Sequence, residues 1–264
     1  MLTVTSATIT PFSRAGVDYI EVLWRESGGM LLTDNIECGF AMGAGGGAGG
    51  RSNSYTWISG GAGSGGCYAE PVLPLSAGTY TIEIGAGAPA STTAGGSANG
   101  SNTTFDGPDG VLTTLGGGSG ATHGGNASAG NGGSGGGARG GPTGTTNGGV
   151  GTPGAGFGGG SGIIDAAVEN QAGGGGGGKG GVGGNASNGI AGNGGPGLLL
   201  DWIAAPITVC SGGDGCVYDA GEPIVNSPNQ DWGSGSGGSM MGTAGAGGDG
   251  FLFIVVRADE VNVQ

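Results

Sequence analysis

The chain has 264 residues, of which 75 are glycine, and a formal net charge of −13. Glycine at this level is typical of linkers, collagen-like rods and disordered segments. Collagen is excluded because glycine does not recur at every third position and only 11 prolines are present, and disorder alone is not expected because only 9% of residues are charged.

The N-terminal residues MLTVTSATIT lack the basic start and apolar centre of a secretory signal, and no run of 18 apolar residues follows anywhere. Neither export by such a signal nor membrane insertion is therefore expected. The chain has only 6 lysines and arginines in total, and they form no basic patch. Nucleic-acid binding would lack its electrostatic driving force and is not expected either.

Three segments predict the strands of a framework. In residues 17–24, VDYIEVLW, the alternation places Ile20, Val22 and Trp24 on one face. Residues 79–84, TYTIEI, alternate in the same way, as a half-buried strand does. Residues 251–256, FLFIVV, are apolar throughout, which predicts a strand buried on both faces.

Glycine tracts lie between these strands, at 43–50, 60–66, 116–141, 148–162, 173–197 and 233–250. No helical periodicity crosses them, and the one short helix expected, of about two turns, lies at 163–171. Counted in threes from Lys179, one column carries side chains while the next is almost entirely glycine, as far as Gly195. That pattern favours polyproline-II-type glycine helices that pack side by side and exchange backbone hydrogen bonds.

These elements predict one glycine-rich domain over 1–264. Its expected fold class is mainly β or irregular, with a polyglycine II helix bundle clamped by a small β-sheet or sandwich and almost no α-helix. A segment poorer in glycine, 198–232, interrupts the pattern before the last predicted strand.

The four cysteines are Cys38, Cys67, Cys210 and Cys216, which allow three pairings into two disulfides. Cys210 and Cys216 are the only close pair, so a disulfide between them would close a loop inside the 198–232 insertion. Their C-x5-C spacing matches no common zinc pattern and the chain has a single histidine. No metal site is therefore expected.

Enzymatic activity is not expected. His123 lies in a glycine tract without the G-x-S-x-G turn of a hydrolase nucleophile. Two carboxylate pairs could suit glycan cleavage, Asp106 with Asp109 and Asp219 with Glu222, but turn chemistry explains both without a site. No cofactor is expected; calcium is the one candidate, because GAGGDGFLF at 245–253 resembles a single calcium-binding repeat.

Two segments carry a resemblance to a known family, CYAEPVLPLSAGTYTIEIGAGAP at 67–89 and GSNTTFDGPDGVLTTLGGGSG at 100–120. With the glycine tracts and the closing apolar strand, the chain resembles the glycine-rich domains of bacteriophage tail-fibre and tail-tip proteins. It is similar in particular to the polyglycine II adhesins that cap the long tail fibres of T-even-like phages. Glycine-rich domains of receptor tyrosine kinases and of mycobacterial surface proteins share part of this glycine-rich sequence pattern.

The resemblance implies a virion tail protein, made in the host cytoplasm and exposed on the particle, whose loops between glycine helices bind a bacterial surface receptor, either protein or glycan. Its other partners would be further phage tail proteins. Fibres are commonly homotrimers whereas the related fibre-tip adhesins are monomeric caps, so both states stay open. The alternatives are a purely structural tail subunit that contacts only virion neighbours and, less favoured, a secreted glycine-rich surface protein of a cell.

Aromatic side chains outside the strands are the candidate receptor-binding residues, because exposed aromatics serve as apolar anchors for sugars or proteins. They are Tyr55, Trp57, Trp202, Tyr218 and Trp232. The alternative for each is packing in a core, which LLLDW at 198–202 favours for Trp202 in particular.

Overall fold

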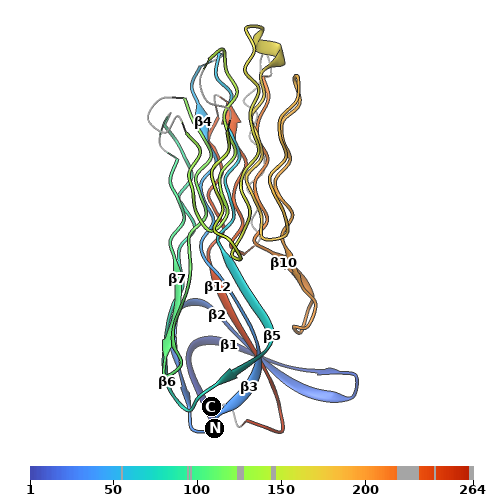
Figure 1. Ribbon diagram of the computed structural model, residues 1–264. Coiled ribbons are helices and arrows are strands. Elements are labelled where there is room, and N and C mark those ends of the chain that lie inside the picture. Colours follow the sequence, from blue (N-terminus) through green and yellow to red (C-terminus); the bar gives the residue numbers. More distant parts are fainter. Residues whose placement is uncertain are drawn as a thin grey trace.

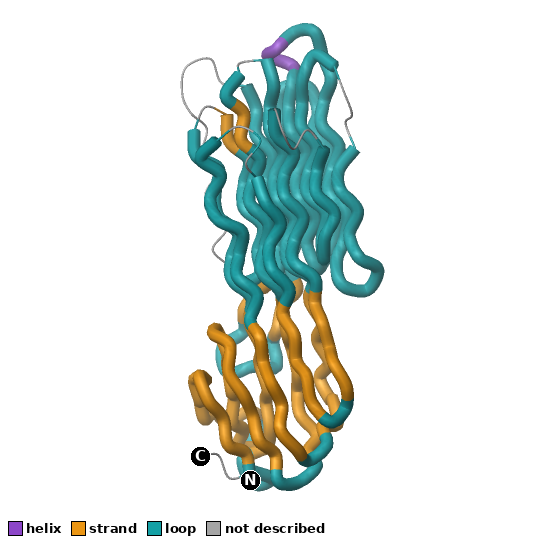
Figure 2. Tube along the Cα trace, turned by 90° about the vertical axis from the view of Figure 1, so that its left-hand side faces the viewer, coloured by secondary structure: helices purple, strands orange, loops and turns teal. Residues whose placement is uncertain are grey.

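The computed structural model describes residues 1–54, 56–93, 95, 97–123, 128–143, 147–218, 232–240 and 242–261. A curved β-sheet forms one end of the molecule, and a layer of extended glycine-rich segments continues from it to the other end (Figures 1 and 2). The structure is mainly β, and the described residues contain one helical turn, the 3-10 helix η1 at Val168–Asn170.

The sheet curls into a nearly closed, barrel-like shape (Figure 2). Its strands follow the order β5-β3-β12-β2-β6-β7-β8, with β1 also paired to β2, and neighbouring strands are antiparallel. The strands are β1 (Leu2–Arg14), β2 (Val17–Leu32), β3 (Ile36–Gly43), β5 (Cys67–Leu75), β6 (Gly78–Glu83), β7 (Thr103–Gly107), β8 (Gly110–Thr114) and β12 (Phe251–Arg257).

Two short pairs complete the strands. An antiparallel hairpin of β9 (Leu198–Leu200) and β10 (Ile207–Val209) lies beside the sheet, and a parallel pair of β4 (Arg51–Ser52) and β11 (Ser239–Met240) lies at the far end of the glycine layer (Figure 1).

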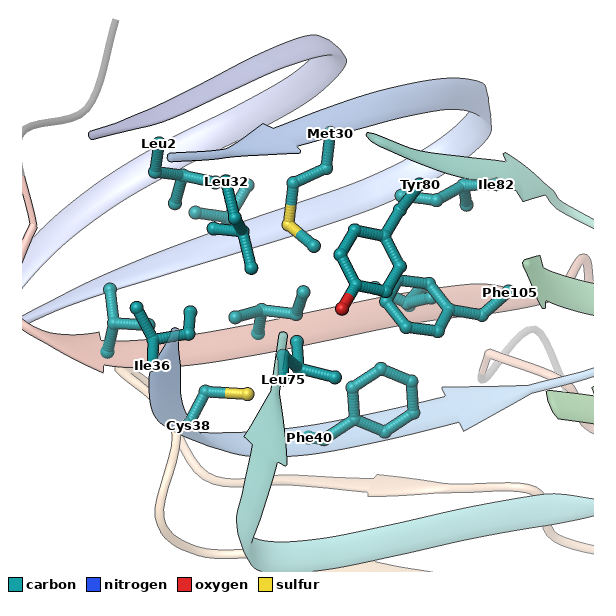
Figure 3. Packing of buried hydrophobic residues seen from close by; sticks show 14 of the residues in the cluster. Leu2, Met30, Leu32, Ile36, Cys38, Phe40, Leu75, Tyr80, Ile82 and Phe105 are labelled. Atoms are coloured by element: carbon teal, nitrogen blue, oxygen red, sulfur yellow. The ribbon is translucent and has the colours of Figure 1, made fainter. Parts of the chain in front are cut away.

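The strands predicted at 17–24 and 251–256 lie within β2 and β12, and the one predicted at 79–84 overlaps β6, which ends one residue earlier. Strand β12 is buried on both faces, as its apolar sequence indicated: Leu252, Ile254 and Val256 point into one apolar cluster and the alternate residues point into another. The first cluster fills the inside of the curled sheet (Figure 3). Tyr80 stacks on Phe105 there with ring centroids 4.7 Å apart, and such aromatic pairs stabilise beyond their buried area.

The second cluster covers the opposite face of β12 and is closed by the β9–β10 hairpin. Leu200, Ile203 and Val209 of this hairpin region are buried against Phe251 and Phe253. Residues 198–210 of the insertion, with Trp232, therefore cover the sheet, because their apolar side chains pack on the outer apolar face of β12. Residues 219–231 lie outside the described residues.

The glycine-rich segments form the second half of the molecule, and several of them are direct continuations of strands. Residues 44–50 follow β3, 59–66 lead into β5, and 244–250 lead into β12. Their backbone N–H and C=O groups bond to neighbouring segments at about the usual backbone distance, as in Gly63 N to Gly118 O at 2.8 Å. The layer thus satisfies its buried backbone without a ladder of regular strands.

The hydrogen bonds of segment 60–66 rotate among three neighbours. Residues 60, 63 and 66 donate to residues of 115–121, residues 61 and 64 donate to 174–177, and residues 62 and 65 donate to 233–236. A β-strand alternates between two neighbours in one plane. Here every third N–H returns to the same neighbour, so the segment is bonded on three sides.

Glycine is required for this spacing. A Cβ on Gly46 would lie 1.8 Å from Ser234 O, and a Cβ on Gly176 would lie 1.8 Å from Ala62 O. Both distances are far below van der Waals contact, so the neighbouring backbones would have to separate. The layer is therefore built on close backbone approach rather than on a side-chain core.

Two sequence-based expectations for the glycine tracts are wrong in detail. The helix expected at 163–171 is reduced to the single turn of η1. The run from Lys179 to Gly195 is not one continuous column: it bends at 179–181 and reverses at a turn, where Ser187 pairs with Ile190. Gly189 has a φ of 66° at this turn, a conformation that glycine adopts without steric cost.

Candidate functional site

The segments of the glycine layer reverse direction at the end that lies away from the sheet, which we call the apex (Figure 1). Isolated bridges tie the reversals to one another, including Ile58 to Gly140 and Ala172 to Val217. Met1 and Val261 lie at the sheet end, where Val261 packs into the inner cluster. The apex is therefore the part of the molecule most distant from both.

Trp57 lies at the apex, where backbone hydrogen bonds of the next residue, Ile58, fix its position. Ile58 N donates to Gly140 O at 3.0 Å and Gly140 N donates back to Ile58 O at 2.8 Å. This bridge sets Trp57 beside the residues that flank Gly140. A Cβ on Gly141 would lie 2.2 Å from the Trp57 ring, so the indole lies directly on the Gly141 backbone.

Arg139 and His123 both contact the Trp57 ring. The Arg139 guanidinium carbon lies 4.1 Å from the ring centroid, within the range of a cation–π interaction. The His123 ring stacks on the indole with centroids 5.3 Å apart and planes inclined by 15°. We call Trp57, His123 and Arg139 the apical cluster; all three side chains are half-buried.

The charge of Arg139 is not neutralised by a carboxylate among the described residues. Its Nη1 donates to Thr122 O at 3.4 Å, and its buried Nε has no hydrogen-bond partner in the described part of the chain. Burial lowers the pKa of Arg139, yet a guanidinium stays charged in proteins. The apex therefore presents a cation beside an aromatic ring in an otherwise acidic protein, an arrangement that can bind a carboxylate, a phosphate or a second aromatic group.

The other predicted aromatic residues are divided between the two ends. Tyr218 is half-buried against Ile58, Cys216 and Met240, so it shares the apex with Trp57. Tyr55 lies outside the described residues. The structure therefore brings two of the five candidates to the apex.

Trp202 and Trp232 pack on the sheet instead. The Trp202 ring lies 2.9 Å from the position that a Cβ on Gly39 would take. Trp232 lies 5.1 Å from Phe253 between ring centroids, and the Arg25 guanidinium carbon lies 4.6 Å from its ring. Packing on the outer cluster accounts for both positions.

The possible disulfide between Cys210 and Cys216 is absent, and all four cysteines are free and buried. Cys210 belongs to the outer cluster of the sheet, whereas Cys216 lies beside Ile58 at the apex. The extended residues 211–215 separate them, and an extended chain advances about 3.3 Å per residue. The two Cα atoms are therefore too distant for a disulfide, which needs about 7 Å or less.

Two of the acidic residues considered for catalysis or calcium, Asp109 and Asp249, have structural partners. Asp109 accepts hydrogen bonds from Ser76 N at 2.9 Å and from the Tyr80 hydroxyl at 2.6 Å. Asp249 accepts one from Gly87 N at 2.8 Å, at the junction of sheet and glycine layer. Asp219 and Glu222 lie outside the described residues. In the described ranges no three His, Cys, Asp or Glu side chains gather as a metal-binding group.

Trp57 could be named from the sequence as a candidate receptor-binding residue, but the two residues that contact its ring could not. His123 enters there only as a catalytic candidate, and Arg139 only as one of the 6 basic residues. Arg139 is one of only 6 basic residues and stands alone inside a glycine tract. The isolation of this one charged side chain within a glycine tract was the available signal.

Comparison with known proteins gives the family of the chain. No curated protein matches it, and in the described residues no helix is both long and apolar enough to cross a membrane. The family model of the glycine-rich domain matches residues 34–257, which include the glycine layer, the apical cluster and the strands from β3 to β12. The chain therefore belongs to the glycine-rich domain family.

Proposed function

We propose that the protein is a bacteriophage tail-fibre or tail-tip protein that binds a bacterial surface receptor through its apical loops. The glycine layer would then be a bundle of polyglycine II helices that holds these loops away from the particle. Support for the helix type comes from segment 60–66, whose donors return to the same neighbour at every third residue. That periodicity matches a helix of three residues per turn without internal hydrogen bonds.

The apical cluster is the observation that carries the proposal of receptor binding. Trp57 and Arg139 are residue types that dominate the binding energy of protein interfaces. Their contact, with the guanidinium carbon 4.1 Å from the ring centroid, holds both in place before a partner arrives. Preorganisation of this kind lowers the entropic cost of binding.

The position of the cluster supports the same function. It lies at the end opposite to Met1 and Val261, so the sheet end is free to contact other tail proteins while the apex faces the cell (Figure 1). Residues 59–66 and 132–140 lead to the cluster through backbone hydrogen bonds on several sides. A stiff support keeps a recognition surface at a fixed distance from the particle.

Binding to whole cells tests the proposal. Fluorescently labelled protein is titrated against a panel of bacterial strains, and bound cells are counted by flow cytometry. Wild-type protein is expected to bind at least one strain. The double variant Trp57→Ala, Arg139→Ala is expected to lose at least tenfold in affinity, which corresponds to about 1.4 kcal/mol.

The matched control is Phe157→Ala. Phe157 is an aromatic residue with 46% of its surface exposed, and it lies at the opposite end of the glycine layer from the apex, next to the turn where Cys67 N of β5 donates to Ala155 O. This variant is expected to bind like wild type. If both variants lose affinity equally, recognition does not take place at the apex. If wild-type protein binds none of the bacterial strains in the panel, the adhesin proposal is wrong.

A purely structural tail subunit is the second candidate, and the side of the glycine layer favours it. Val150 and Phe157 expose 66% and 46% of their surfaces and line one open hollow together with Pro153, and apolar side chains gathered at one exposed place are typical of surfaces that contact other proteins. Protein that is present in purified virions but neither binds cells nor competes with infection would favour this function.

A further inference from the structure

Two cysteines distant in sequence, Cys67 and Cys210, lie in the same apolar cluster. Cys67 begins strand β5 and Cys210 directly follows β10, and both belong to the outer cluster of the sheet with 0% of their surfaces exposed. This is the place where the β9–β10 hairpin meets the junction between sheet and glycine layer. The hairpin region is otherwise held to the sheet by apolar packing and by two hydrogen bonds, from Arg14 Nη1 to Asp201 O at 2.6 Å and from Ala204 N to the Glu21 carboxylate at 2.8 Å.

The strand register directs the Cys67 side chain toward Cys210. Cys67 lies opposite Gly43 in the antiparallel pair of β5 and β3, and directly opposed residues point to the same face with Cβ atoms about 4.5–5.5 Å apart. A Cβ on Gly43 would lie 3.0 Å from the Cys210 Sγ. The Cys210 sulfur therefore lies over the vacant side-chain position next to Cys67.

The backbone around Cys210 holds the sulfur in this position. Cys210 N donates to Trp232 O at 2.9 Å, and Cys210 O accepts from Lys179 N at 2.9 Å. Cys210 has a φ of 56°, which is uncommon for a residue other than glycine and is found where the surroundings enforce it. Gly233 leaves room on another side, because a Cβ there would lie 2.8 Å from the same sulfur.

The Cys67 thiol also affects Cys210 electrostatically. Its proximity, together with burial, raises the pKa of the Cys210 thiol. The remaining cysteines have other surroundings: Cys38 lies in the inner cluster, and Cys216 contacts the Ser59 hydroxyl at 3.4 Å near the apex. Cys67 and Cys210 are thus the pair that the fold brings together.

We propose that Cys67 and Cys210 form a disulfide when the protein meets an oxidising medium, and that this bond fastens the β9–β10 hairpin to β5. The oxidant is a low-molecular-weight disulfide such as oxidised glutathione. One protein thiol loses its proton and attacks the oxidant, which gives a mixed disulfide and one glutathione thiolate. The second protein thiolate displaces the other glutathione, so two protons and two electrons leave the cysteines and two reduced glutathione molecules form.

The test uses the purified 264-residue chain, incubated with oxidised glutathione and then alkylated. Mass spectrometry of a non-reduced digest is expected to find a peptide that joins Cys67 to Cys210, while Cys38 and Cys216 are alkylated. On a non-reducing gel the oxidised chain is expected to migrate faster, because the bond closes a long loop, and reductant should reverse the shift. This measurement needs no variant, so it does not depend on whether a substitution folds.

Variants give the second measurement. Cys67→Ser and Cys210→Ser are expected to abolish the mobility shift, whereas the controls Cys38→Ser and Cys216→Ser are expected to retain it. A joined peptide with any other pairing would overturn the proposal. Complete alkylation of both Cys67 and Cys210 after prolonged oxidation in mild denaturant, where the thiols are accessible, would overturn it as well.

Discussion

Replacing Gly176 by alanine tests whether close backbone approach stabilises the glycine layer. The added Cβ would lie 1.8 Å from Ala62 O, whereas a carbon–oxygen contact needs about 3.3 Å. The two segments must therefore separate by about 1.5 Å. Such a shift breaks hydrogen bonds that now measure 2.9 to 3.1 Å: Gly61 N to Gly174 O, Ser64 N to Gly177 O, and Gly213 N to Ala62 O.

The expected loss of stability follows from these bonds. Each contributes a net of about 1 kcal/mol, and alanine returns about 0.4–1 kcal/mol by restricting the unfolded chain. Gly176→Ala should therefore lower the free energy of unfolding by about 2–3 kcal/mol. The measurement is the guanidinium chloride midpoint, followed by intrinsic fluorescence and circular dichroism.

Gly158→Ala is the matched control for this prediction. A Cβ on Gly158 would meet Gly149 O at 3.1 Å and no other atom closer than 4.0 Å, so a small local shift accommodates it. The free energy of unfolding of this variant should lie within about 0.5 kcal/mol of the wild-type value or slightly above it. If both variants unfold at the same denaturant concentration, backbone approach does not determine the stability of the layer.

Three further predictions concern the cysteine pair, the apex and a turn of the sheet. The free energy of unfolding should be about 4–5 kcal/mol higher for oxidised than for reduced protein, as measured by denaturant titration with and without dithiothreitol, because the Cys67–Cys210 bond closes a long loop. Formation of the disulfide should accelerate about tenfold per pH unit from pH 6 to 8, since the raised pKa of Cys210 leaves little thiolate in this range. A pH-independent rate would contradict this prediction. Arg139→Lys keeps the charge but loses the planar contact with Trp57, so amide hydrogen exchange at Ile58 should accelerate about two- to fivefold, as a loss of about 0.5–1 kcal/mol implies; unchanged exchange would show that the contact adds nothing. Hydrogen bonds from Ser76 and Tyr80 lower the pKa of Asp109, so its contribution is complete above about pH 5 and is lost as pH falls through its folded pKa; Asp109→Asn should flatten the acid part of the stability profile, and parallel profiles would refute the assignment.

The strands at 17–24, 79–84 and 251–256 could be predicted because their apolar periodicity reports burial directly. Others escaped for physical reasons. In β1 (Leu2–Arg14) most side chains are threonine, serine or small residues with weak alternation, since this strand lies at the edge of the sheet on β2. Strand β5 contains two prolines, which are typical of edge positions.

The apical cluster could not be assembled from sequence. Trp57, His123 and Arg139 come from three separate segments, and only the bridge between Ile58 and Gly140 makes two of them neighbours. Glycine tracts carry no side-chain pattern that reveals which segments pair. The three-residue count from Lys179 missed the reversal at Gly189 because a turn leaves no mark in a pattern that records only every third residue.

The rotation of hydrogen bonds among three neighbours has a consequence for alignment. Sliding a glycine segment by three residues along its neighbours would restore almost every backbone bond, so the layer alone does not specify which residue faces which. The strands do: β3, β5 and β12 continue directly into segments 44–50, 59–66 and 244–250, and their side chains allow a single register. The sheet therefore sets the alignment of the glycine segments. A substitution that loosened its register would displace the distant loops by three residues, or a multiple of three, while the glycine layer kept its backbone hydrogen bonds.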